Sequence, residues 1–77
     1  MNNFAPDKSA SMFDFPLLSR LIVRELKRQH VTYEEMALQI NVSLSTFKRM
    51  ISDPGGARAA NLHSLLHELG IRIWLER

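Results

Sequence analysis

The stretch TYEEMALQINVSLSTFKRMI, residues 32–51, constrains this chain more than any other segment. Thr32 and Glu35 have the spacing of a capping box, in which each side chain accepts a hydrogen bond from the other residue's backbone N–H. Asn41 is expected to end that helix, because asparagine tolerates a left-handed backbone. Ser43 is then placed to cap a second helix. The segment therefore predicts two short helices joined by a tight turn.

The apolar positions of this segment give both helices an inward side. Ala37 supplies the small side chain that two steeply crossing helices need where they meet. Phe47 and Met50, three residues apart, are expected to pack against the first helix. The spacing of Ala37, Asn41, Phe47 and Met50 matches a helix-turn-helix motif. The outward positions of the second helix are then Ser43, Leu44, Ser45, Lys48, Arg49 and Ser52.

Composition narrows the class of protein. The chain has 77 residues and no cysteine, so one small domain without disulfides or thiolate metal sites is expected. This fits a cytoplasmic protein, and no apolar run approaches the ~20 residues of a membrane-spanning helix. Seven of the ten cationic side chains are arginines, and the net charge is +2. Arginine favours phosphate, because its planar fork donates two hydrogen bonds at once.

The chain divides into three expected parts. Residues 1–13 show no helical or strand period and predict a flexible tail. Residues 14–70 form the helical domain. Residues 71–77 alternate apolar and polar side chains and predict a strand. We find no second strand in the sequence, so the same strand of a second copy is the expected partner. The expected dimer interface is Ile71, Ile73, Trp74 and Leu75.

Two further helices are expected in the helical domain. The first begins near Asp14, which can cap it, and ends near residues 29–31. The last follows a turn at residues 53–56, with Asn61 as its cap and Gly70 as its C-terminal stop. The exposed cations of the first helix, Arg20, Arg24, Lys27 and Arg28, are expected to form a solvated face.

We interpret the outward side of the helix after Ser43 as a surface for double-stranded DNA, because a short polar and cationic helix face suits the major groove. Ser45 and Arg49 are the expected base contacts, and Arg49 can donate two hydrogen bonds to a guanine. Leu44 can pack against a thymine methyl. Lys48 either contacts a phosphate or stays in solvent. The other expected contacts, mostly to the sugar-phosphate backbone, are Tyr33, Ser43, Thr46 and Ser52.

Residues 16–70 resemble the Cro/CI-type repressor fold, the XRE-type helix-turn-helix family. The shared order is a first helix, the Thr-led motif VTYEEMALQINVSLSTFKRMI, a short loop and a leucine-rich helix ending in LHELGI. The resemblance implies an all-α, lambda-repressor-like domain of four helices that binds operator DNA as a two-fold dimer. The closing IRIWLE is similar to the C-terminal strand of Cro and of HipB-like antitoxins. The loop departs from the family's Glu-x-Gly stop, and Arg58 is our expected phosphate contact there.

Three functions stay open at this point. A sequence-specific, dimeric transcriptional repressor is the first interpretation. An antitoxin that binds operator DNA and also a toxin protein is the second, and a protein-binding adaptor without DNA binding is the third. We expect no enzyme and no cofactor, since the serines have no partnering His–Asp arrangement. His63 and His67 have the spacing of a helical metal pair but lack a third ligand, so no metal is expected.

Overall fold

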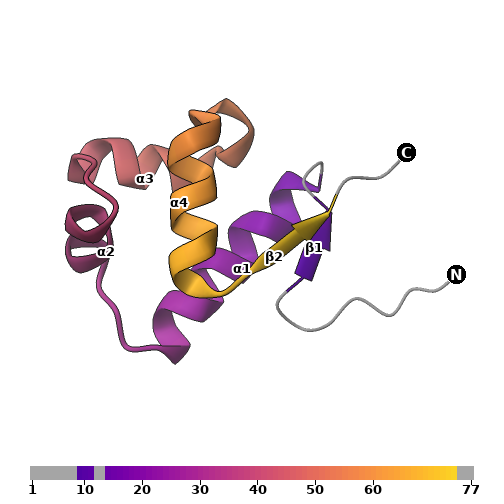
Figure 1. The fold of residues 1–77 in the computed structure, drawn as a ribbon, viewed down its shortest axis with the longest axis horizontal. Coiled ribbons are helices and arrows are strands. Elements are labelled where there is room, and N and C mark those ends of the chain that lie inside the picture. Colours follow the sequence, from indigo (N-terminus) through magenta and orange to yellow (C-terminus); the bar gives the residue numbers. More distant parts are fainter. Residues whose placement is uncertain (1–8, 12–13, 75–77) are drawn as a thin grey trace, which may run out of the picture.

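A computed structural model describes residues 9–11 and 14–74 (Figure 1). Within them are four α-helices, one short 3₁₀ helix and a pair of three-residue strands. In chain order they are β1 (Ser9–Ser11), α1 (Phe15–Arg28), α2 (Tyr33–Gln39), α3 (Leu44–Ser52), η1 (Pro54–Gly56), α4 (Ala59–Leu69) and β2 (Arg72–Trp74). In Figure 1, α4 crosses in front of α1, with α2 and α3 on one side and the strands on the other. None of the described helices has the length and apolar character needed to cross a membrane.

The first three helices begin at the caps that the sequence predicts. Asp14, Thr32 and Ser43 each accept a hydrogen bond from the backbone N–H three residues on, at 3.0–3.1 Å. The Glu35 carboxylate completes the capping box by accepting from the Thr32 N–H at 2.8 Å, and this hydrogen bonding lowers the pKa of Glu35. Asn41 has a φ of 63° in the turn, so the predicted left-handed residue is confirmed.

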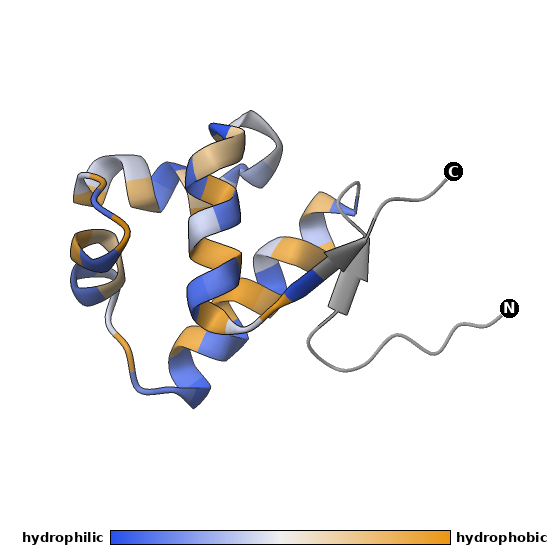
Figure 2. Ribbon diagram, in the orientation of Figure 1, coloured by the Kyte–Doolittle hydropathy of each residue, from blue (hydrophilic) through white to orange (hydrophobic). Residues whose placement is uncertain are grey.

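A single apolar core joins all four helices. Figure 2 shows apolar and hydrophilic residues on different sides of the helices, as expected for amphipathic segments. Burying one large aliphatic or aromatic side chain contributes about 1.5–3 kcal/mol, so the core accounts for much of the stability of a chain this short. Its buried members are Leu18, Leu21, Ile22, Leu26, Met36, Ala37, Phe47, Met50, Ile51, Leu62, Leu65, Leu66, Leu69 and Ile71.

The start of α4 differs from the prediction. The helix begins at Ala59, with Arg58 at the N-cap position and no side-chain hydrogen bond to its first turn. Asn61 is therefore the third residue of the helix and not its cap. Alanine has the highest helix propensity, and Ala59 with Ala60 extends the helix upstream of Asn61. The predicted stop is confirmed, since Gly70 has a φ of 73°.

One carboxylate is buried at the end of α1, and the sequence analysis missed it. Glu25 is 2 % exposed and accepts hydrogen bonds from Arg28 at 2.8 and 3.0 Å and from the Gln29 amide at 3.1 Å. The same amide donates to the backbone carbonyl of Leu69 at 3.0 Å, which joins the ends of α1 and α4. Arg28 is thus an ion-pair partner, and its side chain, 58 % exposed, still lies on the solvated face that the sequence predicts. The hydrogen bonds and charge of Glu25 raise the pKa of Arg28.

The two strands lie side by side and run parallel, with Ser9 opposite Arg72 and Ser11 opposite Trp74. The expectation that the sequence holds no second strand is therefore wrong. A three-residue strand with two serines has too little apolar alternation to be recognised, and it falls within the tail predicted for residues 1–13. Ile71, expected at a dimer interface, is buried in the core of its own chain. The side chains of Ile73 and Trp74 and all of Leu75 lie outside the described residues.

Candidate nucleic-acid interface

The inward side of α3 holds this helix in place. Phe47 and Met50 are 0 % and 2 % exposed, and Ala37 on α2 is 3 % exposed. The ring of Tyr33 meets the ring of Phe47 edge-on, with 5.4 Å between ring centroids. The Ser19 hydroxyl of α1 donates a hydrogen bond to the backbone carbonyl of Ile51 near the end of α3. The predicted inward positions are confirmed, and α3 rests on both α1 and α2.

The outward side of α3 faces solvent. Ser45, Lys48, Arg49 and Ser52 are exposed, and Leu44 is half-buried at the start of the helix. Within the described residues neither cation of α3 has an ion pair. The structure therefore leaves both positive charges of α3 available to an external anion.

The hydroxyls at the ends of α3 are engaged in local hydrogen bonds. Ser43 accepts from the Thr46 N–H at 3.1 Å and donates to the Thr46 hydroxyl at 2.9 Å. Ser52 donates to the backbone carbonyl of Arg49 at 3.2 Å. Ser43 and Ser52 therefore stabilise the two ends of α3. Ser45 lies between them in the sequence and is also exposed. Tyr33 opens α2, as the sequence predicts, and its ring is half-buried against Phe47 of α3.

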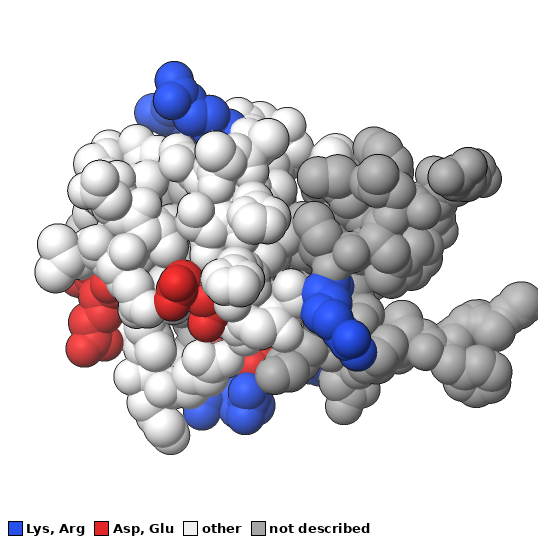
Figure 3. Space-filling view, viewed as in Figure 1, with Lys and Arg blue, Asp and Glu red and all other residues white. Residues whose placement is uncertain are grey.

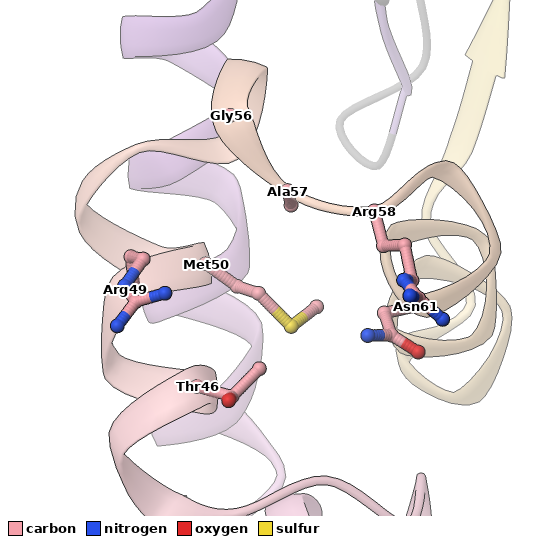
Figure 4. A pocket seen from close by; sticks show the side chains of 7 residues that line it. All are labelled: Thr46, Arg49, Met50, Gly56, Ala57, Arg58 and Asn61. Carbon is pink, nitrogen blue, oxygen red and sulfur yellow. The ribbon is translucent and has the colours of Figure 1, made fainter.

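A hollow of about 330 Å³ separates α3 from the start of α4. Figure 4 shows Arg49 on one side, Arg58 and Asn61 together on the other, and the Met50 side chain extending between them. Sequence reasoning named Arg58 and Arg49 separately, and it missed Asn61 because it assigned that residue to a cap. The residues that line the hollow are Thr46, Arg49, Met50, Gly56, Ala57, Arg58 and Asn61.

Charge is unevenly distributed over this region. Figure 3 shows one group of cationic side chains at the edge where α3 and the start of α4 lie, with no acidic side chain beside it in that view, and further cationic groups at two other places. One carboxylate does lie near the hollow: a Cβ added to Gly56 would meet the Oδ2 atom of Asp53. Glycine at position 56 therefore leaves room for the Asp53 carboxylate beside η1.

Two other polar groups of the described residues lie away from this surface. His63 and His67 stack on the exposed side of α4, with 6.2 Å between ring centroids. The described residues include no cluster of three or more potential metal ligands. Arg20, Arg24 and Lys27 are exposed on α1, and with Ser19 and Val23 they line a shallow groove of about 440 Å³.

Comparison with protein-family models, curated proteins and solved structures finds no match to this chain. The family resemblance of residues 16–70 therefore stays a prediction, and the functional argument depends on the geometry of α3 and its surroundings.

Proposed function

We propose that this protein is a sequence-specific regulator of transcription that binds double-stranded DNA through α3. One observation carries the proposal: α3 turns Phe47 and Met50 into the core and leaves Lys48 and Arg49 in solvent. A helix held on one side and cationic on the other is what major-groove recognition requires.

The dimensions of α3 fit this role. An α-helix with its side chains is about 10–12 Å in diameter, and the major groove is about 12 Å wide, so the nine-residue α3 can enter the groove. Ser45 is short and exposed, so the helix can approach the base edges closely at that position. Leu44, half-buried at the start of α3, offers an apolar contact for a thymine methyl.

The arrangement of the helices supports the finer proposal of a lambda-repressor-like, Cro/CI-type domain. The capping box at Thr32, the left-handed Asn41 and the small Ala37 between α2 and α3 all agree with that motif. These are local features of one helix pair. They support the proposed family but do not identify the DNA sequence that the protein would bind.

We further propose that the protein acts as a two-fold dimer. Because β1 occupies one edge of β2, a second copy would pair with the other edge of β2 and extend the sheet. Such a dimer would place two α3 helices one DNA turn apart, about 34 Å. A bound dimer would then obstruct polymerase at a promoter, which makes repression the proposed outcome.

The test is selection of bound duplexes from a random double-stranded library, followed by affinity measurements over a range of salt. We expect the affinity to fall with salt at a log–log slope of about 0.9 per neutralised phosphate. The variant Ser45→Ala/Lys48→Ala/Arg49→Ala should lose selective binding, and Arg20→Ala serves as the control cation outside the surface. Failure of the wild-type protein to bind any duplex at low salt would reject the proposal and favour a protein-binding role.

A further inference from the structure

The outer side of α4 carries two histidines one helical turn apart. His63 and His67 are both exposed, and their rings lie nearly parallel, with 6.2 Å between ring centroids and 14° between ring planes. Within the described residues, neither side chain takes part in an ion pair or a hydrogen bond. The nitrogens of both imidazole rings are therefore available to a ligand from outside the chain.

We propose that His63 and His67 together bind one divalent transition-metal ion of the zinc, copper or nickel type. Water or a second copy of the chain supplies the remaining ligands. The sequence predicts no metal at this pair, because a third ligand is missing from it. That objection falls away when the missing ligands come from outside the chain. The site lies away from the proposed DNA surface and does not depend on DNA binding.

The distance between the two rings fits chelation of one ion. A zinc ion lies about 2.0–2.1 Å from each imidazole nitrogen that binds it, so two rings that share a tetrahedral ion have centroids roughly 5 Å apart. The observed centroids, at 6.2 Å, need to approach by only about 1 Å. A small rotation of two exposed side chains provides this. The helix itself holds the two rings on one face, because residues four apart lie one above the other.

The donor atoms select the class of ion. Imidazole nitrogen suits zinc, copper and nickel, whereas magnesium and calcium prefer oxygen ligands. The part of the chain that the structure describes holds no cluster of three or more potential ligands. The carboxylate of Glu68, next to His67 in the sequence, accepts a hydrogen bond from the Gln39 side-chain amide of α2. The pair therefore holds the ion through two nitrogens and leaves its other coordination positions open.

The surroundings of the pair favour a cation and leave room beside it. His67 lies in the last turn of α4, where the helix dipole is negative. Ala59 and Ala60 are exposed one turn before His63. The Ser64 hydroxyl donates a hydrogen bond to the backbone carbonyl of Ala60 at 3.0 Å. Because these side chains are short, a second copy can bring its own histidine pair to the same ion, and four imidazoles complete a tetrahedral site.

A bound ion would join two successive turns of α4 near the C-terminal end of the helix. It binds both side chains only while this part of the chain is helical, so it binds the folded state in preference to the unfolded state. A ligand of this kind stabilises the folded protein by mass action. The expected consequence is a melting temperature that rises with the concentration of the ion.

The first experiment measures metal binding to the full chain. The ¹⁵N-labelled protein is titrated with zinc chloride and, in a matched series, with magnesium chloride at equal ionic strength. We expect saturable changes of the His63 and His67 ring signals with zinc alone. His63→Ala and His67→Ala should each weaken zinc binding by at least about tenfold, since loss of a residue that only supports a metal ligand already costs that much.

His30→Asn is the matched control. His30 is exposed directly after α1 and lies outside the pair, and asparagine tolerates its positive φ of 58°. This variant should bind zinc as the wild type does. Thermal unfolding gives an independent measurement: zinc should raise the melting temperature of the wild type and of His30→Asn, but not that of His63→Ala or His67→Ala. Without zinc, the two α4 variants should melt like the wild type, because both side chains are exposed.

The second experiment identifies the remaining ligands by sedimentation with and without zinc. One ion per chain with an unchanged mass supports the site and assigns the other positions to water. One ion per two chains, with a zinc-dependent doubling of mass that His67→Ala abolishes, supports the site and assigns them to a second copy.

The proposal is overturned if zinc leaves the ring signals of His63 and His67 unchanged. It is also overturned if both alanine variants bind zinc as tightly as the wild type. Duplex binding is measured on separate samples without metal, so either result leaves the proposed role of α3 to its own test.

Discussion

The outer sides of α1 and α3 both carry exposed cations, but they differ in what faces those cations. Arg20, Arg24 and Lys27 lie along one helix, and the described residues that line their shallow groove all belong to α1. Arg49 and Arg58 instead line one hollow from two separate elements, with the Met50 side chain between them. Among the described residues, charges from separate elements meet only in the second case, and we therefore propose the α3 side, not the α1 side, as the binding surface.

A cation at the end of α1, Arg28, differs from both of these groups because it forms an ion pair within the chain. Arg28 donates two hydrogen bonds to the buried carboxylate of Glu25, so its charge serves the fold. The three settings give three expectations for substitution: a change in stability at Arg28, a change in ligand binding at Arg49, and little change at Arg20.

The largest effect is expected from removing the support of α3. Phe47→Ala should lower the free energy of unfolding by about 3–5 kcal/mol, because it opens a cavity in the core that α2 and α3 share. Urea denaturation measures this loss, and duplex binding should disappear with it. Leu38→Ala is the matched control: Leu38 is 82 % exposed on α2, so a change below about 0.5 kcal/mol is expected. Equal effects of the two variants would contradict the proposed support.

The comparison between the two cationic sides is tested directly by single substitutions. Arg49→Ala should weaken duplex binding by about 1–3 kcal/mol if Arg49 donates two hydrogen bonds to a guanine, as the sequence predicts. Arg20→Ala should leave the affinity within about twofold. Fluorescence anisotropy at fixed salt measures both. If Arg20→Ala weakened binding as much as Arg49→Ala, α1 would belong to the interface and the contrast between the two sides would fail.

A smaller loss of stability is expected at the end of α1. Arg28→Ala should lower the melting temperature, because Glu25 is buried and loses two of its hydrogen bonds. The effect should be well below that of Phe47→Ala, since Arg28 is 58 % exposed and Gln29 keeps its hydrogen bond to Glu25. Arg20→Ala is again the control, and a melting curve as low as that of Arg28→Ala would contradict a specific role for the Glu25 pair.

The smallest expected effect is a change in stability with pH that arises from Glu35 at the start of α2. Hydrogen bonds from Thr32 lower the pKa of Glu35 in the folded chain, so its carboxylate adds stability that is fully present above the unfolded pKa of ~4.3. This stability is lost as the pH falls through the lowered folded value. The stability difference between the wild type and Glu35→Gln should therefore shrink on acidification. Urea titrations at several pH values measure this difference. A difference that grows below pH 4 would contradict a lowered pKa of Glu35 in the folded chain.

Sequence reasoning succeeded where the physical cause is local. Helix caps and turns depend on interactions within about four residues, so the residue types are enough to predict them. This holds for the caps at Asp14, Thr32 and Ser43 and for the turns at Asn41 and Gly70. The inward positions of α3 followed from helical spacing for the same reason. Each of these features was confirmed in the structure.

What escaped prediction depends on residues far apart in the chain. Glu25 is buried where α1 meets α4. There the Gln29 side-chain amide donates one hydrogen bond to Glu25 and another to the backbone carbonyl of Leu69. The convergence of Arg49 and Arg58 depends on how η1 turns the chain between two helices. No spacing rule encodes either arrangement, since neither is periodic within one element. The DNA contacts themselves stay predictions of the sequence and proposals of the structure.

The parallel pairing of β1 with β2 makes the two ends of the chain depend on each other. The two strands are far apart in the sequence, so their pairing carries the loop-closure entropy of the helices between them. An affinity tag fused before Ser9 would therefore disturb β2 as well as β1. Proteins prepared for binding studies should be compared with the tag at either end and with the tag removed.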